Sequence, residues 1–133
     1  MKRKYTILLV VVLLLAGMVA AGYIIKGRLE KNLKSLASLA ITDPDLSRVP
    51  DGEYTGSYAA FPVSAEVRVA VANGKITGIT LVKHVTGQGQ PAEVLPDRVV
   101  EEQTLQVDAV AGATYSSKVI LKAIERALAG AAP

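Results

Sequence analysis

The residues best placed to do chemistry lie in one short segment near the C-terminal end of the chain. The segment DAVAGATYSSK, residues 108–118, places the hydroxyl of Thr114 directly after Ala111, Gly112 and Ala113. Small residues leave the backbone and a neighbouring hydroxyl open to a ligand or to a modifying enzyme. Thr114 is therefore the candidate functional residue, as a hydroxyl that could carry a phosphate.

An amphipathic helix is predicted directly after Thr114. Apolar residues recur at three- and four-residue spacing, which is typical of a helix with one buried face; they are Val119, Ile120, Ala123, Ile124, Ala127 and Leu128. The first N–H groups of a helix have no acceptor inside it, and the helix dipole adds positive potential there. The segment thus predicts a place for a phosphate. The alternative is structural: Thr114 caps the helix and Gly112 forms a turn.

Three neighbours of Thr114 are further candidates. Ser116 and Ser117 are rival hydroxyls, but both fall in the first helical turn, where the helix is expected to hide them. Tyr115 could stack on a planar ligand, although aromatic residues are more often part of a core.

The same segment is part of a longer pattern. Four blocks follow in order: DGEYTGSY (51–58), VANGKITGITLVKH (71–84), GQGQPAEVLPDRVVEEQ (87–103) and VDAVAGATYSSK (107–118). In these blocks the chain resembles the FMN-binding domain family, which includes extracytoplasmic subunits of the sodium-translocating NADH:quinone reductase and of the Rnf complex. The resemblance implies that FMN is joined through its phosphate to the threonine of an Asp-x-x-(Ser/Thr)-Gly-Ala-Thr motif.

On this resemblance the motif runs from Asp108 to Thr114, and Thr114 carries FMN. A flavin transferase is then an implied partner. The chain departs from the motif at Ala111, where the family has a serine or threonine, so a hydroxyl that could help the transferase to recognise its target is missing. The position of His84 and of the loop with Gly87 and Gly89 in the family implies contact with the flavin.

Taken alone, these last residues are weaker candidates. His84 is the only histidine and the chain has no cysteine, so one chain cannot build a zinc site of the usual His/Cys type. His84 is either a strand-end residue with a structural hydrogen bond or a neighbour of the flavin. The glycine spacing around Gly87 and Gly89 is neither a dinucleotide fingerprint nor a phosphate-binding P-loop.

A membrane anchor is predicted at the N-terminal end. Residues 5–25 carry no charged side chain, and as a helix at ~1.5 Å per residue they extend ~31 Å, enough to cross a hydrocarbon core of ~30 Å. A cleaved signal peptide is the alternative. The predicted organisation is an anchor over residues 1–26, a stalk and linker over 27–50 and an FMN-binding domain over 51–133. Basic residues lie on both sides of the span, so their count does not decide the orientation. Because those before the span are crowded against it beside the terminal amino group, we expect a single-pass protein of the cell membrane with its C-terminal domain extracytoplasmic.

The charge distribution supports this organisation. The chain has a net charge of +3, but seven of its fifteen basic residues precede Ser35, where Glu30 is the only acidic residue. These basic residues are suited to membrane lipid headgroups, and the acidic remainder has no basic stripe for nucleic acid. Without cysteine, disulfides, thiolate nucleophiles and cysteine-ligated iron–sulfur clusters are excluded.

The predicted fold is α+β, a small antiparallel sheet packed with helices. Asn73 and Gly74 predict a two-residue hairpin turn, which would pair Val71 with Ile76, Val69 with Gly78 and Val67 with Thr80. The two faces of this hairpin are not cleanly divided. Either both are partly covered, or a bulge at Gly78 switches the alternation.

Two further elements complete the prediction. Residues 53–60 are expected to form another strand, and residues 91–102 a helix with Val94, Leu95 and Val99 facing inward. Pro96 is expected in the first turn of a second helical segment.

Two functions are consistent with the sequence. The first is a membrane-anchored flavoprotein that carries electrons between donor and acceptor proteins that the sequence does not identify; it would be a redox carrier rather than a self-sufficient enzyme. The alternative is an anchored binding or structural module of the same fold that holds FMN reversibly or not at all. A flavin absorption band that survives denaturation distinguishes the first from the second.

Overall fold

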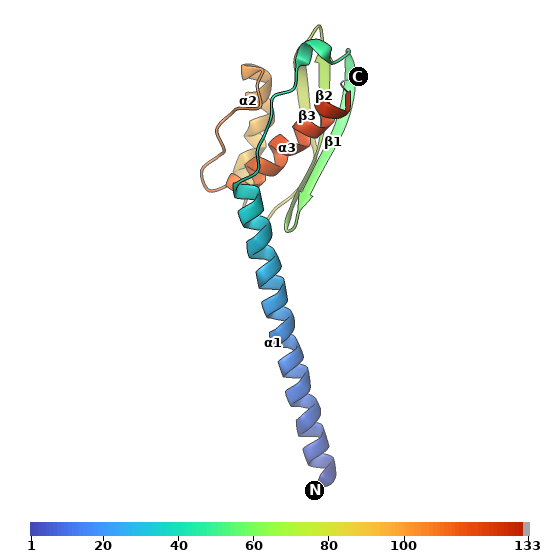
Figure 1. Cartoon of the computed structure of the whole chain (residues 1–133), viewed down its shortest axis with the longest axis vertical. Coiled ribbons are helices and arrows are strands. Elements are labelled where there is room, and N and C mark those ends of the chain that lie inside the picture. Colours follow the sequence, from blue (N-terminus) through green and yellow to red (C-terminus); the bar gives the residue numbers. More distant parts are fainter. Residues whose placement is uncertain (132–133) are drawn as a thin grey trace. The chain divides into compact units, whose positions relative to one another are not determined.

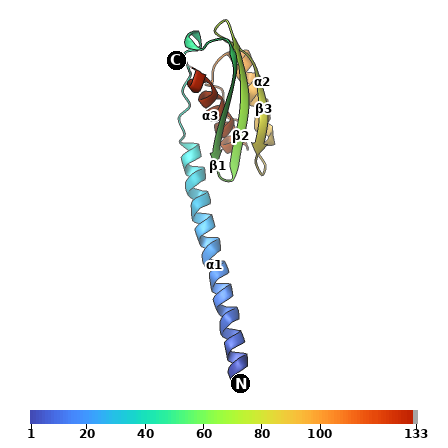
Figure 2. The same cartoon turned by 90° about the vertical axis from the view of Figure 1, so that its right-hand side faces the viewer.

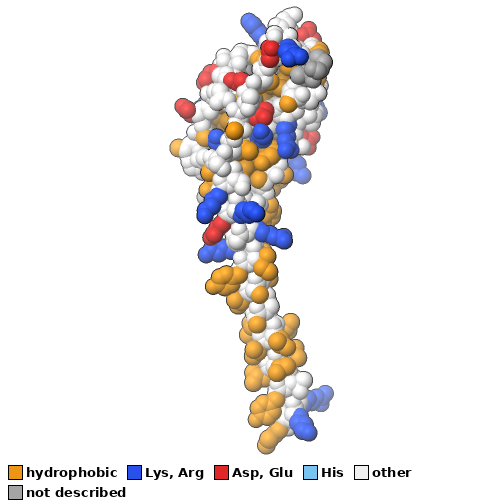
Figure 3. Space-filling view, in the orientation of Figure 1, with side chains coloured by type: hydrophobic (Ala, Val, Ile, Leu, Met, Phe, Trp, Pro, Cys, Tyr) orange, Lys and Arg blue, Asp and Glu red, His pale blue; other side chains and the backbone are white. Residues whose placement is uncertain are grey.

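The structure is a computed structural model that describes residues 1–131. The chain divides into two compact units, residues 1–32 and 33–133. The first unit belongs to one long helix, α1 (Lys2–Ala37), which is long and apolar enough to cross a membrane. Its apolar side chains are exposed along the helix, with basic side chains before and after them (Figure 3). An N-terminal helix of the predicted kind is therefore present.

The second unit is built on a three-stranded antiparallel sheet in the order β1-β2-β3. The strands are β1 (Gly52–Ala60), β2 (Val63–Ala72) and β3 (Lys75–Val85). The helices of this unit are α2 (Leu95–Glu102) and α3 (Thr114–Ala131), with short 3₁₀-helices η1 (Leu46–Arg48) and η2 (Gln90–Val94) (Figures 1 and 2). The α+β prediction is confirmed.

The core lies between the sheet and helix α3. Alternate residues of β2 are buried, because successive side chains of a strand point to opposite faces. The predicted inner face of α3 is buried in full and packs on β1 and β2. The closest approach is at Gly56 of β1, where an added Cβ would lie 2.2 Å from the carbonyl oxygen of Ala123. Glycine is thus what lets α3 lie directly on the sheet.

The hairpin between β2 and β3 has the predicted turn but a different register. Asn73 and Gly74 have φ of 54° and 71°, the positive values that a type I′ turn requires. Val71 pairs with Ile76 as predicted, but the next pair is Ala70 with Gly78, which leaves Thr77 unpaired. The predicted pairs of Val69 with Gly78 and Val67 with Thr80 are therefore wrong; their partners are Ile79 and Leu81.

The first part of the register difference is the bulge at Gly78, one of the two possibilities that the sequence left open. A bulge beside Gly78 switches the alternation, so Ile79 and Leu81 pack against the core. A second register shift leaves Val82 unpaired and returns His84 to the covered face, opposite Ala65. Without this second shift His84 would pair with Ser64, on the face away from the helices.

The helical stretch after the sheet consists of two segments that meet at Leu95. Residues 90–94 form the 3₁₀-helix η2, so Val94 is 46% exposed and its predicted inward position is wrong. The α-helix begins at Leu95, with Pro96 in its first turn as predicted. Leu95 and Val99 are buried, as expected. In the described part of the chain, residues 103–113 then form no further strand.

The segment between α1 and β1 packs on the second unit. Val49 of this segment is buried in the core of the unit, as is Leu36 near the end of α1. The N–H of Thr42 donates to the Glu125 carboxylate of α3 at 3.1 Å, and the carboxylate of Asp43 accepts from the N–H of Leu105. The later part of the segment predicted as stalk and linker therefore belongs to the second unit, which begins at Leu33.

Candidate functional site

A tight turn fixes where α3 begins. The N–H of Ala113 donates to the carbonyl of Val110 at 2.9 Å, and Gly112 has φ of 78°. A positive φ at the third residue is the mark of a type II turn, which favours glycine. Apart from the neighbouring residues, no protein atom lies within 4 Å of an added Cβ on Gly112. The backbone conformation, rather than crowding by the protein, therefore requires glycine here.

Helix α3 begins at Thr114, whereas with Thr114 as its N-cap it would begin at Tyr115. The N–H of Ser117 donates to the carbonyl of Ala113 at 2.9 Å, so Ala113 is the N-cap residue and Thr114 is the first residue of α3. The interpretation of Thr114 as a helix cap is wrong. Alanine has no side-chain oxygen that could accept from the first-turn N–H groups. The donors at this end of α3 are therefore available to an acceptor from outside the helix.

The three aliphatic hydroxyls of the first turn, those of Thr114, Ser116 and Ser117, differ in accessibility. Thr114 is exposed, and its hydroxyl has no hydrogen bond to another described residue. Ser117 is 0% exposed; its Oγ donates to the carbonyl of Ala113 at 2.7 Å and accepts from the N–H of Val110 at 3.0 Å. Ser116 is 2% exposed. The expectation that the helix hides both serines is confirmed, so Thr114 is the accessible hydroxyl of the three.

Ser116 belongs to a chain of hydrogen bonds that runs beneath the first turn. Its Oγ lies 3.0 Å from Nε2 of His84, whose Nδ1 lies 2.9 Å from Oε1 of Glu93. The Oγ of Ser116 also lies 3.0 Å from Oγ1 of Thr86, and the Thr86 oxygen accepts from the N–H of Gly89 at 2.9 Å. These contacts connect the end of β3, the following loop and η2 with the start of α3.

The order Glu93–His84–Ser116 has the connectivity of a hydrolase triad. The serine is nevertheless inaccessible, and a Cβ on Gly89 would lie 1.9 Å from its Oγ. There is no room at this oxygen for an acyl group. We interpret the three residues as a structural connection rather than as a nucleophile with its base.

The structure brings some of the predicted site residues together. His84 and Gly89 meet Ser116 at the start of α3, next to the turn formed by Gly112 and Ala113. Tyr115 is 40% exposed beside Thr114. Asp108 and Gly87 are exposed, and neither has a hydrogen bond to another described residue.

Sequence reasoning missed Thr86 and Glu93. Their partners are 30 and 9 residues away along the chain, so no local spacing indicates the contacts. The bulged register of β3 places His84 on the covered face, and this register is not evident from the pattern of apolar residues.

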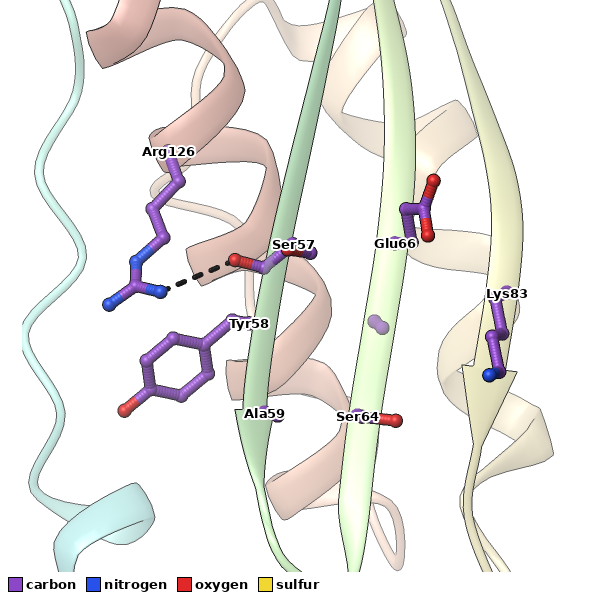
Figure 4. Close-up of a pocket in the computed structure, with 8 residues that line it drawn as sticks. Ser57, Tyr58, Ala59, Ser64, Glu66, Lys83 and Arg126 are labelled. Atoms are coloured by element: carbon purple, nitrogen blue, oxygen red, sulfur yellow. Dashed lines mark hydrogen bonds between the residues drawn. The ribbon is translucent and has the colours of Figure 1, made fainter.

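A hollow of about 380 Å³ lies elsewhere on the domain. The guanidinium of Arg126 lies 4.7 Å from the ring centroid of Tyr58 and donates to the Ser57 carbonyl at 3.4 Å. In Figure 4 these two side chains lie beside β1, whereas Glu66 and Lys83 extend from β2 and β3. The charged groups do not converge on one point, so the start of α3 is the better candidate site. The described residues hold no cluster of three or more His, Asp or Glu side chains suited to a metal.

Comparison with known proteins identifies the family of the chain. The model of the FMN-binding domain family matches residues 62–129, just over half of the 133-residue chain. The matched part contains β2, β3 and α2 and every candidate residue from His84 to Ser117. A search of curated proteins finds no match.

Proposed function

This chain belongs to the FMN-binding domain family, and on that premise we propose that it is a membrane-anchored electron carrier whose FMN is joined through its phosphate to Thr114. Membership of the family gives FMN as the cofactor, and α1 is long and apolar enough to serve as an anchor. The observation that supports the attachment site is the contrast between the exposed Thr114 and the buried Ser116 and Ser117.

The residues at the start of α3 fit a phosphate. The N–H groups of Tyr115 and Ser116 belong to the first turn, where the helix dipole favours negative charge. Ala113 leaves these donors free of a side-chain cap, and the exposed ring of Tyr115 offers a surface for stacking on a planar group. When bound, FMN supplies the redox chemistry, and these residues bind and orient it.

In the proposed attachment, Oγ1 of Thr114 attacks the FMN phosphorus of an activated flavin nucleotide, in which that phosphorus is joined to a second phosphate. The bond from Oγ1 to phosphorus forms, the phosphoanhydride bond breaks and the second phosphate group leaves. The hydroxyl proton passes to a base of the flavin transferase, and the chain gains one FMN less one water. Outside the cytosol free FMN is dilute, so a reversible site would lose its FMN by mass action. A covalent bond would keep the FMN on the domain.

A flavin-free or reversible module is the second candidate, and Ala111 favours it. This residue is exposed in the turn before α3, where a serine or threonine would present its hydroxyl to an approaching transferase. The purified protein distinguishes the candidates. Covalent FMN stays with the denatured chain, reversible FMN is released on denaturation, and a flavin-free module is colourless.

We expect Gly112→Val to lose flavin before it loses its fold. A β-branched residue at a φ of 78° costs on the order of 1–3 kcal/mol, which the turn can avoid by moving Thr114 away from its position. The flavin-to-protein ratio measures the loss, and near-UV circular dichroism checks the fold. Gly130→Ala is the control, because Gly130 lies in α3 with open space around it. A full complement of FMN in Gly112→Val would contradict the role of this turn.

We also propose that the second unit is extracytoplasmic. Lys2, Arg3 and Lys4 precede the apolar part of α1 and favour an N-terminus that stays inside. Protease added to cells whose outer layer is removed should digest the chain beyond about Ser35, and an N-terminal tag should remain protected. If the C-terminal unit is fully protected until the membrane is dissolved, the proposed orientation is wrong.

A further inference from the structure

The hydrogen-bonded connection beneath α3 has no assigned role in the attachment of FMN to Thr114. It consists of His84, Ser116, Thr86 and Glu93, with Gly89 packed against it. We infer that His84 is a positioning residue that acts through Ser116 to hold the first turn of α3, and with it Thr114, in place. This inference rests on the proposed function, attachment of FMN at Thr114.

The position of His84 supports this role. The residue stands at the end of β3, and the bulge at Val82 turns its side chain to the covered face, where it is 3% exposed. Both ring nitrogens have partners, Glu93 on η2 and Ser116 on α3. An imidazole held at both nitrogens cannot rotate without breaking one of the two bonds, so its ring is a fixed support for the helix.

The hydroxyl partner suits an imidazole in either protonation state. Because Nδ1 of His84 faces the Glu93 carboxylate, it carries a hydrogen and donates. Nε2 then accepts from the Ser116 hydroxyl when His84 is neutral and donates to it when His84 is charged. The hydroxyls of Ser116 and Thr86 can rotate to match, so the connection is kept in both states.

Ser116 is also held by the loop that follows β3. The backbone of Gly89 approaches so closely that a Cβ there would overlap both Ser116 and Thr86. Ser116 lies two residues after Thr114 in the same helical turn, so a shift of Ser116 moves the Thr114 hydroxyl with it. Displacing a reacting group by about 1 Å can slow a reaction by about 100-fold.

Two substitutions of His84 separate its two bonds. The amide nitrogen of asparagine occupies about the place of Nδ1, so His84→Asn keeps a donor for Glu93 and loses the bond to Ser116. The amide nitrogen of glutamine reaches about the place of Nε2, so His84→Gln keeps a donor for Ser116 and loses the bond to Glu93. Ser116→Ala leaves His84 unchanged and removes the hydroxyl through which it contacts α3.

The test measures the initial rate at which a flavin transferase labels the full-length chain, read by intact mass. If His84 acts through Ser116, His84→Asn and Ser116→Ala slow labelling by about tenfold or more, whereas His84→Gln stays within about threefold of the wild type. A wild-type rate in His84→Asn, or an equal loss in His84→Gln, would overturn the inference. Should His84→Asn not fold, Ser116→Ala removes the same bond and takes its place.

A second measurement does not depend on flavin. Amide hydrogen exchange of residues 114–121 in the unlabelled chain should be faster in His84→Asn and Ser116→Ala than in the wild type, and unchanged in His84→Gln. If the wild type is never labelled, the proposed function fails, while this exchange pattern still decides whether His84 holds the helix. Equal exchange in all four proteins would refute the positioning role.

Discussion

Thr114→Ala is expected to abolish covalent flavin attachment completely while the protein remains folded. The substitution removes the accessible aliphatic hydroxyl of the first turn, and the remaining aliphatic hydroxyls, Ser116 and Ser117, are buried and hydrogen-bonded. The side chain of Thr114 is exposed and makes no hydrogen bond to another described residue, so its loss should change stability by less than about 0.5 kcal/mol. Intact mass after coexpression with a flavin transferase measures attachment, as a gain of one FMN less one water.

Thr114→Ser is the matched control. It keeps an oxygen nucleophile at the same position, so we expect at least partial labelling. Labelling of Thr114→Ala would move the attachment site to Ser116 or Ser117 and would require α3 to open at its start, because both oxygens are buried. A wild type that never gains mass would instead favour the reversible or flavin-free module.

The largest expected loss of stability is at Gly56. A Cβ at this position would lie 2.2 Å from the carbonyl oxygen of Ala123 and 2.4 Å from the backbone nitrogen of Ala127. Both are backbone atoms of α3, so Gly56→Ala forces the helix away from β1. We expect the free energy of unfolding to fall by about 3 kcal/mol, at the upper end of overpacking effects. The corresponding fall in melting temperature is on the order of 10 °C, measured by near-UV circular dichroism of the tyrosines.

Gly78→Ala provides the comparison for Gly56→Ala. Gly78 also lies in the sheet, but no atom lies within 4 Å of an added Cβ, and its φ is not positive. We expect its unfolding free energy to change by no more than about 0.5 kcal/mol. Equal stability of the two variants would mean that α3 does not depend on a close approach at Gly56.

The sequence by itself determined the features that depend on local pattern. The apolar spacing from Val119 to Leu128 predicts the buried face of α3, because a helix repeats every 3.6 residues wherever it lies in a fold. The Asn73-Gly74 turn is likewise local, since these residues tolerate positive φ. Thr114 could be singled out because its small neighbours and the following helix are adjacent in the chain.

The register of the sheet was only partly predictable. The sequence indicates a possible bulge at Gly78, since glycine within a strand pattern is a common sign of one. It gives no sign of the second irregularity at Val82. Packing decides which residues of β3 stay unpaired. Ile79 and Leu81 are partly buried against the core, and His84 contacts Glu93 and Ser116.

Only the tertiary structure decided how the site is supported. The contact between His84 and Ser116 joins residues 32 positions apart, and the bond from Thr42 to Glu125 joins residues 83 apart. No periodicity encodes such contacts, because they depend on where strand, loop and helix meet after folding. The same holds for the N-cap of α3: cap preferences favour Thr114, but the turn at Gly112 and the two hydrogen bonds of the Ser117 hydroxyl start the helix one residue earlier. That shift leaves the Thr114 hydroxyl exposed instead of bound to its own helix.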